Sequence, residues 1–198
     1  SINRENLLNY NIETLTKEEF ISRSKDGTKG VFTRNRDLPF KHLIVLLLRK
    51  LSKSIQRELD IFSKEVMGSE FNIRTVTKGA FSKARRNLKP SAFIELSEGT
   101  VDAFYKQRCH LEFLGHRLLA VDGSCLLLPN HPSIKEEFGE HGWGPNADSM
   151  RSMASISLLY DPLNLVTIDA QIASYASSER ELLMQHLSKV KAGDLLLL

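Results

Sequence analysis

Apolar side chains recur at helical spacing through the first half of the chain. The clearest case lies between residues 54 and 66, where one face repeats at i, i+4, i+7 and i+11, at Ile55, Leu59, Phe62 and Val66. Similar patterns predict helices over residues 15–23, 40–53, 76–89 and 91–105. Residues 24–39 carry Gly, Asp and Pro between these segments and predict a loop. The first half is therefore expected to be helical.

The pattern changes after residue 110. Short apolar runs predict strands over residues 117–122, 153–160 and 164–173, while residues 130–150, rich in Gly, His, Pro and Asn, predict a surface loop. Ser178 and Glu181 have the spacing of a capping box, which predicts a helix over 179–190, and four leucines at 195–198 predict another strand. Antiparallel strands followed by a helix and a further strand indicate a mixed sheet, so the expected fold class is α+β.

Two different stripes run along the predicted helix 76–89. Thr77 is a favourable N-cap, and the apolar stripe consists of Phe81, Ala84 and Leu88. The remaining surface is polar and cationic, and the side chains on it that could lie along DNA phosphates are Lys78, Lys83, Arg85 and Arg86. A solvated helix that packs on a core through its apolar stripe explains the same pattern. The spacing alone leaves both interpretations open.

The charges of the 198-residue chain are unevenly distributed, although the formal net charge is only +3. Residues 1–90 contain 19 Lys or Arg and 10 Asp or Glu, whereas residues 91–198 contain 8 and 14. A basic half favours a polyanion such as nucleic acid as its partner. The longest apolar run, residues 43–48, is too short to span a membrane, and the two cysteines form no zinc motif and fit a reducing, cytoplasmic setting.

Asp122 is the first residue that could carry chemistry. It follows the apolar run 118–121, and a carboxylate in a core strand is costly unless it is paired or binds a metal such as Mg²⁺. Asp122-Gly123 is also a common turn pair, so a hairpin turn is the alternative. The six histidines show no metal-ligand spacing and are interpreted as surface or packing residues, and Ser157 lacks a nucleophile-elbow context.

Five segments occur in an order and at a spacing that resemble a known protein family. They are Thr77–Arg86, Arg117–Ser124, Ser157–Asn164, Ser178–Glu181 and Gly193–Leu198. Together they resemble the first half of a bacterial DDE transposase of the insertion-sequence-four group, over residues 32–198. The resemblance implies a helical DNA-binding region over residues 1–108. It also implies the N-terminal part of a ribonuclease-H-like catalytic domain over residues 109–198.

By this resemblance, Asp122 is the first of three catalytic acids that hold two Mg²⁺ ions, and the ions activate water or a DNA 3′-hydroxyl for phosphoryl transfer. The resemblance also implies binding to transposon terminal repeats and target DNA, dimerisation on DNA, and a location in the bacterial cytoplasm with the nucleoid. The second acid would follow the last strand, a position that Asp161, Asp169 and Asp194 do not match, and the glutamate would come later. We therefore expect the natural protein to continue beyond Leu198 and this chain to be catalytically inactive.

Two other functions stay open. A shortened transposase that keeps its DNA-binding region would be an inactive regulator or remnant that competes with the intact enzyme. An α+β domain with a structural role is the third interpretation, and it predicts no DNA binding at low salt.

Overall fold

The computed structural model describes residues 4–26, 38–49, 51–68, 76–143 and 149–198. The chain divides into a helical unit, Asn3–Thr100, and a sheet unit, Val101–Leu198, and each has its own apolar core. The division falls within helix α6 (Ser91–Lys106), whereas the sequence analysis placed the domain boundary after residue 108.

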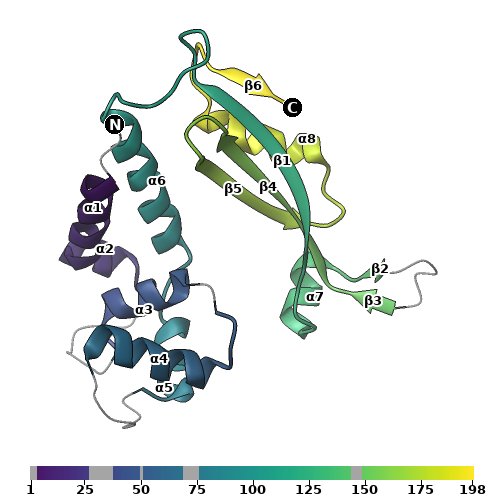
Figure 1. Ribbon diagram of the computed structural model, residues 1–198. Helices are drawn as coiled ribbons and strands as arrows, with labels where there is room; N and C mark the ends of the chain where they lie inside the picture. Colours follow the sequence, from purple (N-terminus) through teal and green to yellow (C-terminus); the bar gives the residue numbers. More distant parts are fainter. Residues whose placement is uncertain (1–3, 27–37, 50, 69–75, 144–148) are drawn as a thin grey trace. The chain divides into compact units, whose positions relative to one another are not determined.

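The helical unit is drawn from purple to teal in Figure 1. Its elements are α1 (Arg4–Thr16), α2 (Glu18–Arg23), α3 (Phe40–Leu48), α4 (Ile55–Met67), α5 (Lys78–Arg86) and the part of α6 that precedes Val101. The predicted helices 54–66, 76–89 and 91–105 are thus confirmed as α4, α5 and α6.

Apolar side chains pack the helical unit in two clusters. One gathers around Leu43, Phe62 and Phe81 from α3, α4 and α5, and the other around Phe20, Phe40 and Ile44. Leu43 and Ile44 are adjacent in α3, and both have no exposed surface. Helix α3 therefore supplies both clusters, which explains why almost every residue of this short helix is apolar.

The sheet unit is built around one mixed, four-stranded sheet. Its elements are β1 (Leu118–Leu127), α7 (Pro132–Phe138), β2 (His141–Trp143), β3 (Ser149–Arg151), β4 (Met153–Asp161), β5 (Val166–Ser174), α8 (Glu179–His186), the 3₁₀ helix η1 (Leu187–Lys189) and β6 (Leu195–Leu197). The strand order is β5-β4-β1-β6, with β6 parallel to β1 and the other neighbours antiparallel. A parallel return strand requires a crossover, which α8 provides. The predicted α+β class and mixed sheet are confirmed.

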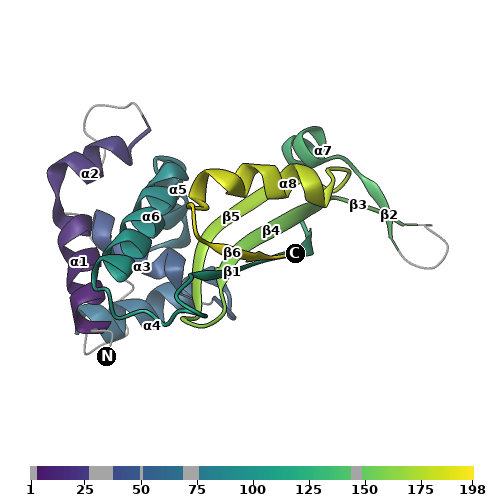
Figure 2. The same ribbon diagram turned by 90° about the horizontal axis from the view of Figure 1, so that it is seen from above.

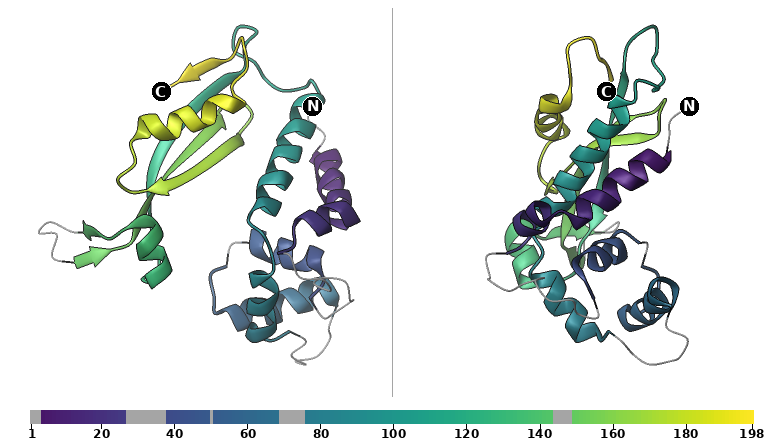
Figure 3. Two further views of the ribbon diagram at one scale, coloured as in Figure 1. Left: turned by 180° about the vertical axis from the view of Figure 1, so that it is seen from behind. Right: turned by 90° about the vertical axis from the view of Figure 1, so that its left-hand side faces the viewer.

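Helix α8 lies across one face of the sheet, as seen from above in Figure 2. The apolar core on that face contains Leu119, Leu159 and Ile168, with Val121 packed against them. Because side chains alternate along a strand, Gly123 shares this face with Leu119 and Val121. Gly123 is paired with Ser157 of β4, so Ser157 also faces α8. Seen from behind, α7 and the ribbon of β2 and β3 project beyond the four-stranded sheet (Figure 3).

Several elements differ from the sequence-based expectations. Residues 4–16 form a helix that was not predicted, and the helix predicted over 15–23 begins only at Glu18. Helix α3 ends at Leu48 because Arg49 has an extended backbone. The expected loop 130–150 contains α7, β2 and β3, and Pro132 occupies the first turn of α7, where its missing N–H does no harm. Of the loop predicted over 24–39, residues 27–37 lie outside the described residues.

Candidate functional site

A pocket of about 480 Å³ opens between β1 and α8 in the sheet unit. Its lining combines residues 121–125 of β1, residues 155–157 of β4, and Ser177, Glu179, Arg180, Leu182, Leu183 and Leu198. The edge of β1 is paired with β6 only over Leu118–Ala120, and the lining begins with the next residue of β1. The size falls in the range of small-ligand sites, and apolar and ionisable groups line the pocket together.

Asp122 lies in the lining of this pocket. The residue belongs to the uninterrupted strand β1 and is paired with Leu158 of β4, so the hairpin-turn alternative for Asp122-Gly123 is wrong. Asp122 is exposed, and the described residues offer its carboxylate no hydrogen bond. Glu179 approaches the same strand, because a Cβ on Gly123 would lie 3.7 Å from Glu179 Oε1. Side chains alternate along β1, so the Asp122 carboxylate points to the opposite face of the sheet from Gly123, and Glu179 approaches the Gly123 face.

The N-terminal end of α8 is fixed by local interactions. Ser178 Oγ accepts a hydrogen bond from the Glu181 N–H at 3.2 Å, and Glu181 Oε2 accepts one from the Ser178 N–H at 3.0 Å, which confirms the predicted capping box. Leu182 and His186 are one helical turn apart and are both buried against the sheet. This anchoring places Glu179, in the first turn of α8, on the side of the pocket.

A buried hydrogen-bonded chain of Ser157, His186 and Asp169 runs beneath α8. His186 Nε2 lies 3.0 Å from Ser157 Oγ, and His186 Nδ1 lies 2.7 Å from Asp169 Oδ2. His186 has no exposed surface, Ser157 is 3% exposed, and Ser157 also lines the pocket. The chain joins β4, β5 and α8, and we call it the Ser157–His186–Asp169 relay.

The ionisation of Asp169 sets the direction of these hydrogen bonds. Burial is the largest influence and acts to raise the pKa of Asp169, but hydrogen bonds from Gln171 and His186 outweigh it and hold that pKa below its usual range. An ionised carboxylate only accepts, so His186 Nδ1 carries a proton. In a neutral imidazole Nε2 is then the acceptor, and the Ser157 hydroxyl donates to it.

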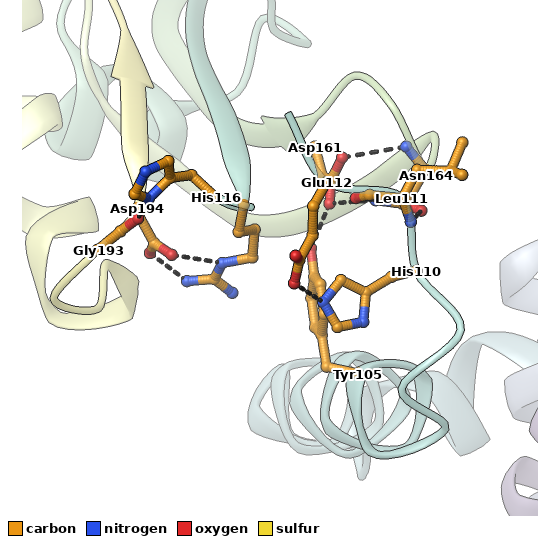
Figure 4. A network of polar contacts seen from close by, with 10 residues as sticks. Tyr105, His110, Leu111, Glu112, His116, Asp161, Asn164, Gly193 and Asp194 are labelled. Atoms are coloured by element: carbon orange, nitrogen blue, oxygen red, sulfur yellow. Dashed lines mark hydrogen bonds and ion pairs between the residues drawn. The ribbon is translucent and has the colours of Figure 1, made fainter. Parts of the chain in front are cut away.

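A second polar network connects the end of α6 and the loop after it with the turn between β4 and β5 (Figure 4). Asp161 is fully buried, accepts a hydrogen bond from Tyr105 Oη at 2.6 Å, and accepts from the N–H groups of Leu163 and Asn164 at 3.1 and 3.0 Å. Asn164 in turn exchanges two hydrogen bonds with the backbone of Leu111. Burial and the bond to Asp161 raise the pKa of Tyr105. Asp161 therefore stabilises the turn.

Arg117 and Asp194 form a largely buried ion pair beside that network. The guanidinium makes two hydrogen bonds to the carboxylate, one of them 3.0 Å from Nε to Oδ1, and lies over the Tyr105 ring at 5.0 Å. The side chains are 10% and 6% exposed. Burial acts to raise the pKa of Asp194, but the bonds from Arg117 and the Lys191 N–H outweigh it and lower the pKa. Asp194 thus fixes the entry to β6 beside β1.

The basic helix α5 is positioned by its neighbours within the helical unit. Phe81 is 2% exposed in the apolar cluster, the Ala80 N–H donates to Thr77 Oγ1 at 3.2 Å, and Gln56 bonds to the backbone of Val76 and Lys78 at 3.0 Å each. The four cations predicted to bind DNA, Lys78, Lys83, Arg85 and Arg86, are all exposed. None of their side chains forms an ion pair with any described residue, and the Arg85 guanidinium lies over Phe81 at 5.9 Å.

The structure thus separates the sequence-predicted residues into two groups, with Asp122 in the sheet unit and the four cations in the helical unit.

Sequence reasoning missed the Ser157–His186–Asp169 relay. The three residues are spaced unevenly along the chain, and strand pairing and helix packing bring them together. His186 is buried with both ring nitrogens bonded, which fits the interpretation of the histidines as surface or packing residues. A polar residue on the buried face of the predicted helix 179–190 was the available signal.

Among the described residues, no group of three or more His, Cys, Asp or Glu side chains is arranged to hold a metal ion. No helix in the described part of the chain is long and apolar enough to cross a membrane. Comparisons with protein-family models, curated proteins and solved structures found no match.

Proposed function

We propose that this chain is the N-terminal portion of a DDE transposase that binds transposon-end DNA through α5. In a chain that carries all three catalytic acids, the sheet unit would contribute Asp122 to a two-Mg²⁺ site for DNA cleavage and strand transfer. The observation that carries the proposal is the placement of Asp122 on β1 beside the parallel strand β6.

The register of β1 and β6 supports this placement. Ala120 is paired with Leu197, and Asp122 stands two residues further along β1. In a protein whose chain continues in the same register, the residue after Leu198 would stand opposite Asp122 and share its face of the sheet. The resemblance puts the second acid directly after this strand, next to Asp122. A ribonuclease-H-like sheet is the fold proposed for this unit.

The exposed cations of α5 support the DNA-binding part of the proposal. Lys78, Lys83 and Arg86 have no competing partner among the described residues, so they keep their charge available for phosphates. The carboxylate of Glu58, on α4, is not paired with these cations. It accepts hydrogen bonds from the N–H groups of Ser52 and Lys53, at 3.0 and 2.8 Å. Dimerisation on DNA and a location with the nucleoid follow from the same proposal.

The DNA-binding test replaces Arg85 and Arg86 with Ala and titrates fluorescent duplex DNA at several salt concentrations. Each lost phosphate contact lowers the slope of log K against log salt by about 0.9, so the double variant should lose roughly two units of slope. Replacing the exposed Lys106 and Arg151 of the acidic half with Ala removes the same charge elsewhere and should leave the slope unchanged. Equal slopes for wild type and the Arg85, Arg86 variant would reject the interface.

The test of Asp122 uses a transposase chain that carries all three acids, assayed for metal-dependent strand transfer on DNA with transposon ends. Asp122→Ala should abolish transfer while leaving DNA binding unchanged. Asp102→Ala is the matched control, because Asp102 is an exposed acid of α6 outside the pocket. Normal transfer by Asp122→Ala would refute the metal role of this residue. If DNA binding were retained without any transfer activity in the natural protein, the regulator alternative would apply.

A further inference from the structure

The relay beneath α8 has the order of groups found in a nucleophile, its base and an orienting carboxylate. The distance from Ser157 Oγ to His186 Nε2 is 3.0 Å, within the roughly 2.6–3.2 Å that links a nucleophile to its general base. Asp169 accepts from Nδ1–H at 2.7 Å and so selects the tautomer that leaves the Nε2 lone pair facing the hydroxyl. This is the geometry of acyl-transfer catalysis, independent of the DNA function proposed above.

The pocket gives a ligand a route to Ser157. Ser157 is only 3% exposed, but it forms part of the pocket lining. Its cross-strand partner is Gly123, which lines the same pocket and has no side chain, and Glu179 Oε1 approaches the position of a Cβ there to 3.7 Å. The lining around it combines the apolar Val121, Leu182 and Leu183 with the ionisable Glu179 and Arg180. A small acyl group fits the apolar part of this lining.

We infer that Ser157 is a nucleophile that hydrolyses small apolar carboxylic esters, with His186 as general base and Asp169 as the positioning residue. Ser157 Oγ forms a bond to the ester carbonyl carbon while its proton moves to His186 Nε2. The bond from that carbon to the leaving oxygen breaks, and His186 returns the proton to the alcohol. Water then repeats the sequence on the acyl-serine, releasing the acid and restoring the Ser157 hydroxyl.

The first experiment maps the nucleophile in the unmodified 198-residue chain. A small fluorophosphonate forms an Oγ–P bond and releases fluoride, so peptide mass spectrometry after incubation should find one phosphonylated serine, Ser157. Protein unfolded in urea should not react, because the relay exists only in the folded chain. No adduct on the folded protein, or an adduct on a different serine, overturns the inference.

The second experiment measures hydrolysis of p-nitrophenyl butyrate by matched variants. Ser157→Ala should abolish both turnover and labelling, whereas Ser188→Ala should retain both. Ser188 is an exposed serine of η1 outside the pocket. His186→Gln should lower turnover at least about 10²-fold, as expected for the loss of a general base.

A variant that unfolds would lose activity for an unrelated reason, so each is checked by hydrogen exchange of β4 and β5. Asp169→Asn provides the second test of the relay, because an amide can donate to Nδ1 and so favours the wrong tautomer. It should lower kcat by about 10²-fold or more with little change in KM. Folded Ser157→Ala or Asp169→Asn protein with wild-type turnover would show that the relay only holds α8 in place.

Discussion

The helical unit and the sheet unit are stabilised by different kinds of contact. The helical unit buries large apolar side chains such as Phe20, Phe62 and Phe81, and its ion pairs are exposed, with the side chains of Arg23 and Glu95 at 59% and 40%. Among the described residues, the central apolar cluster of the sheet unit contains three buried side chains, those of Leu119, Leu159 and Ile168. That unit instead buries Asp161, His186 and the Arg117–Asp194 pair.

This difference determines how each unit should respond to mutation. When a buried apolar side chain is shortened, the loss in the free energy of unfolding increases with the number of atoms removed. Exposed ion pairs contribute little to that free energy. A buried polar network is different, because removing one member leaves the others desolvated and unpaired. The sheet unit should therefore be the more sensitive one to single polar substitutions, and its networks connect elements that are far apart in sequence.

The largest effect is expected when the buried ion pair is broken. Asp194→Ala leaves the Arg117 guanidinium desolvated without its carboxylate, which should lower the free energy of unfolding of the sheet unit by roughly 3–5 kcal/mol. Hydrogen-exchange mass spectrometry, which reports each unit separately, measures this. Glu65→Ala breaks the exposed pair with Arg49 in the helical unit and should produce no measurable change there. Equal losses for the two variants would remove the distinction between the units.

A smaller loss is expected from the Ser157–His186–Asp169 relay. His186→Gln cannot reach both partners with the imidazole geometry, so Ser157 or Asp169 loses a hydrogen bond in a buried site. The expected cost is about 1–3 kcal/mol of the free energy of unfolding, measured by exchange in β4, β5 and α8. Gln185→Ala, at the exposed neighbouring position of α8, is the control and should be neutral. Wild-type stability in His186→Gln would mean that the relay does not hold the helix, whatever its chemistry.

The sequence predicted the parts of this comparison that depend on local pattern. The apolar spacing in α4, the Thr77 cap of α5 and the Ser178–Glu181 capping box are all local signals, and each is confirmed. The polar networks were not predictable, because Arg117 and Asp194 are 77 positions apart in the chain. Their pairing depends on the parallel register of β1 and β6. Asp122 was singled out from the sequence, but the pocket beside β1, with Glu179 close to Gly123, required the fold.

Acid should lower the stability of the sheet unit, because two of its carboxyl groups have lowered pKa values in the folded state. Asp169 and Asp194 both have pKa values below the usual Asp value of about 4. A group whose pKa is lower in the folded state contributes stability above its unfolded pKa and loses that contribution as the pH falls through the folded pKa. The stability of the sheet unit should thus be constant from pH 7 to 5 with respect to these groups and decrease below about pH 4.

Asp169→Asn provides the control for the acid experiment, because an amide does not titrate. Urea unfolding of this variant between pH 5 and pH 2 should give a lower stability with a shallower dependence on pH than wild type. The same slope in both proteins would show that Asp169 is not among the groups whose protonation destabilises the fold.

The smallest effect is expected from a polar contact in the helical unit. Thr77 Oγ1 accepts a hydrogen bond from the Ala80 N–H at an exposed helix end, where water can replace it. Thr77→Ala should therefore cost about 1 kcal/mol, confined to exchange in α5, whereas Thr77→Ser keeps the hydroxyl and should restore most of it. Because the cap also orders the first turn, which carries Lys78, the Ala variant should weaken DNA binding slightly without changing its salt slope. A loss in Thr77→Ala as large as that in Asp194→Ala would show that exposed and buried polar contacts contribute alike in this protein.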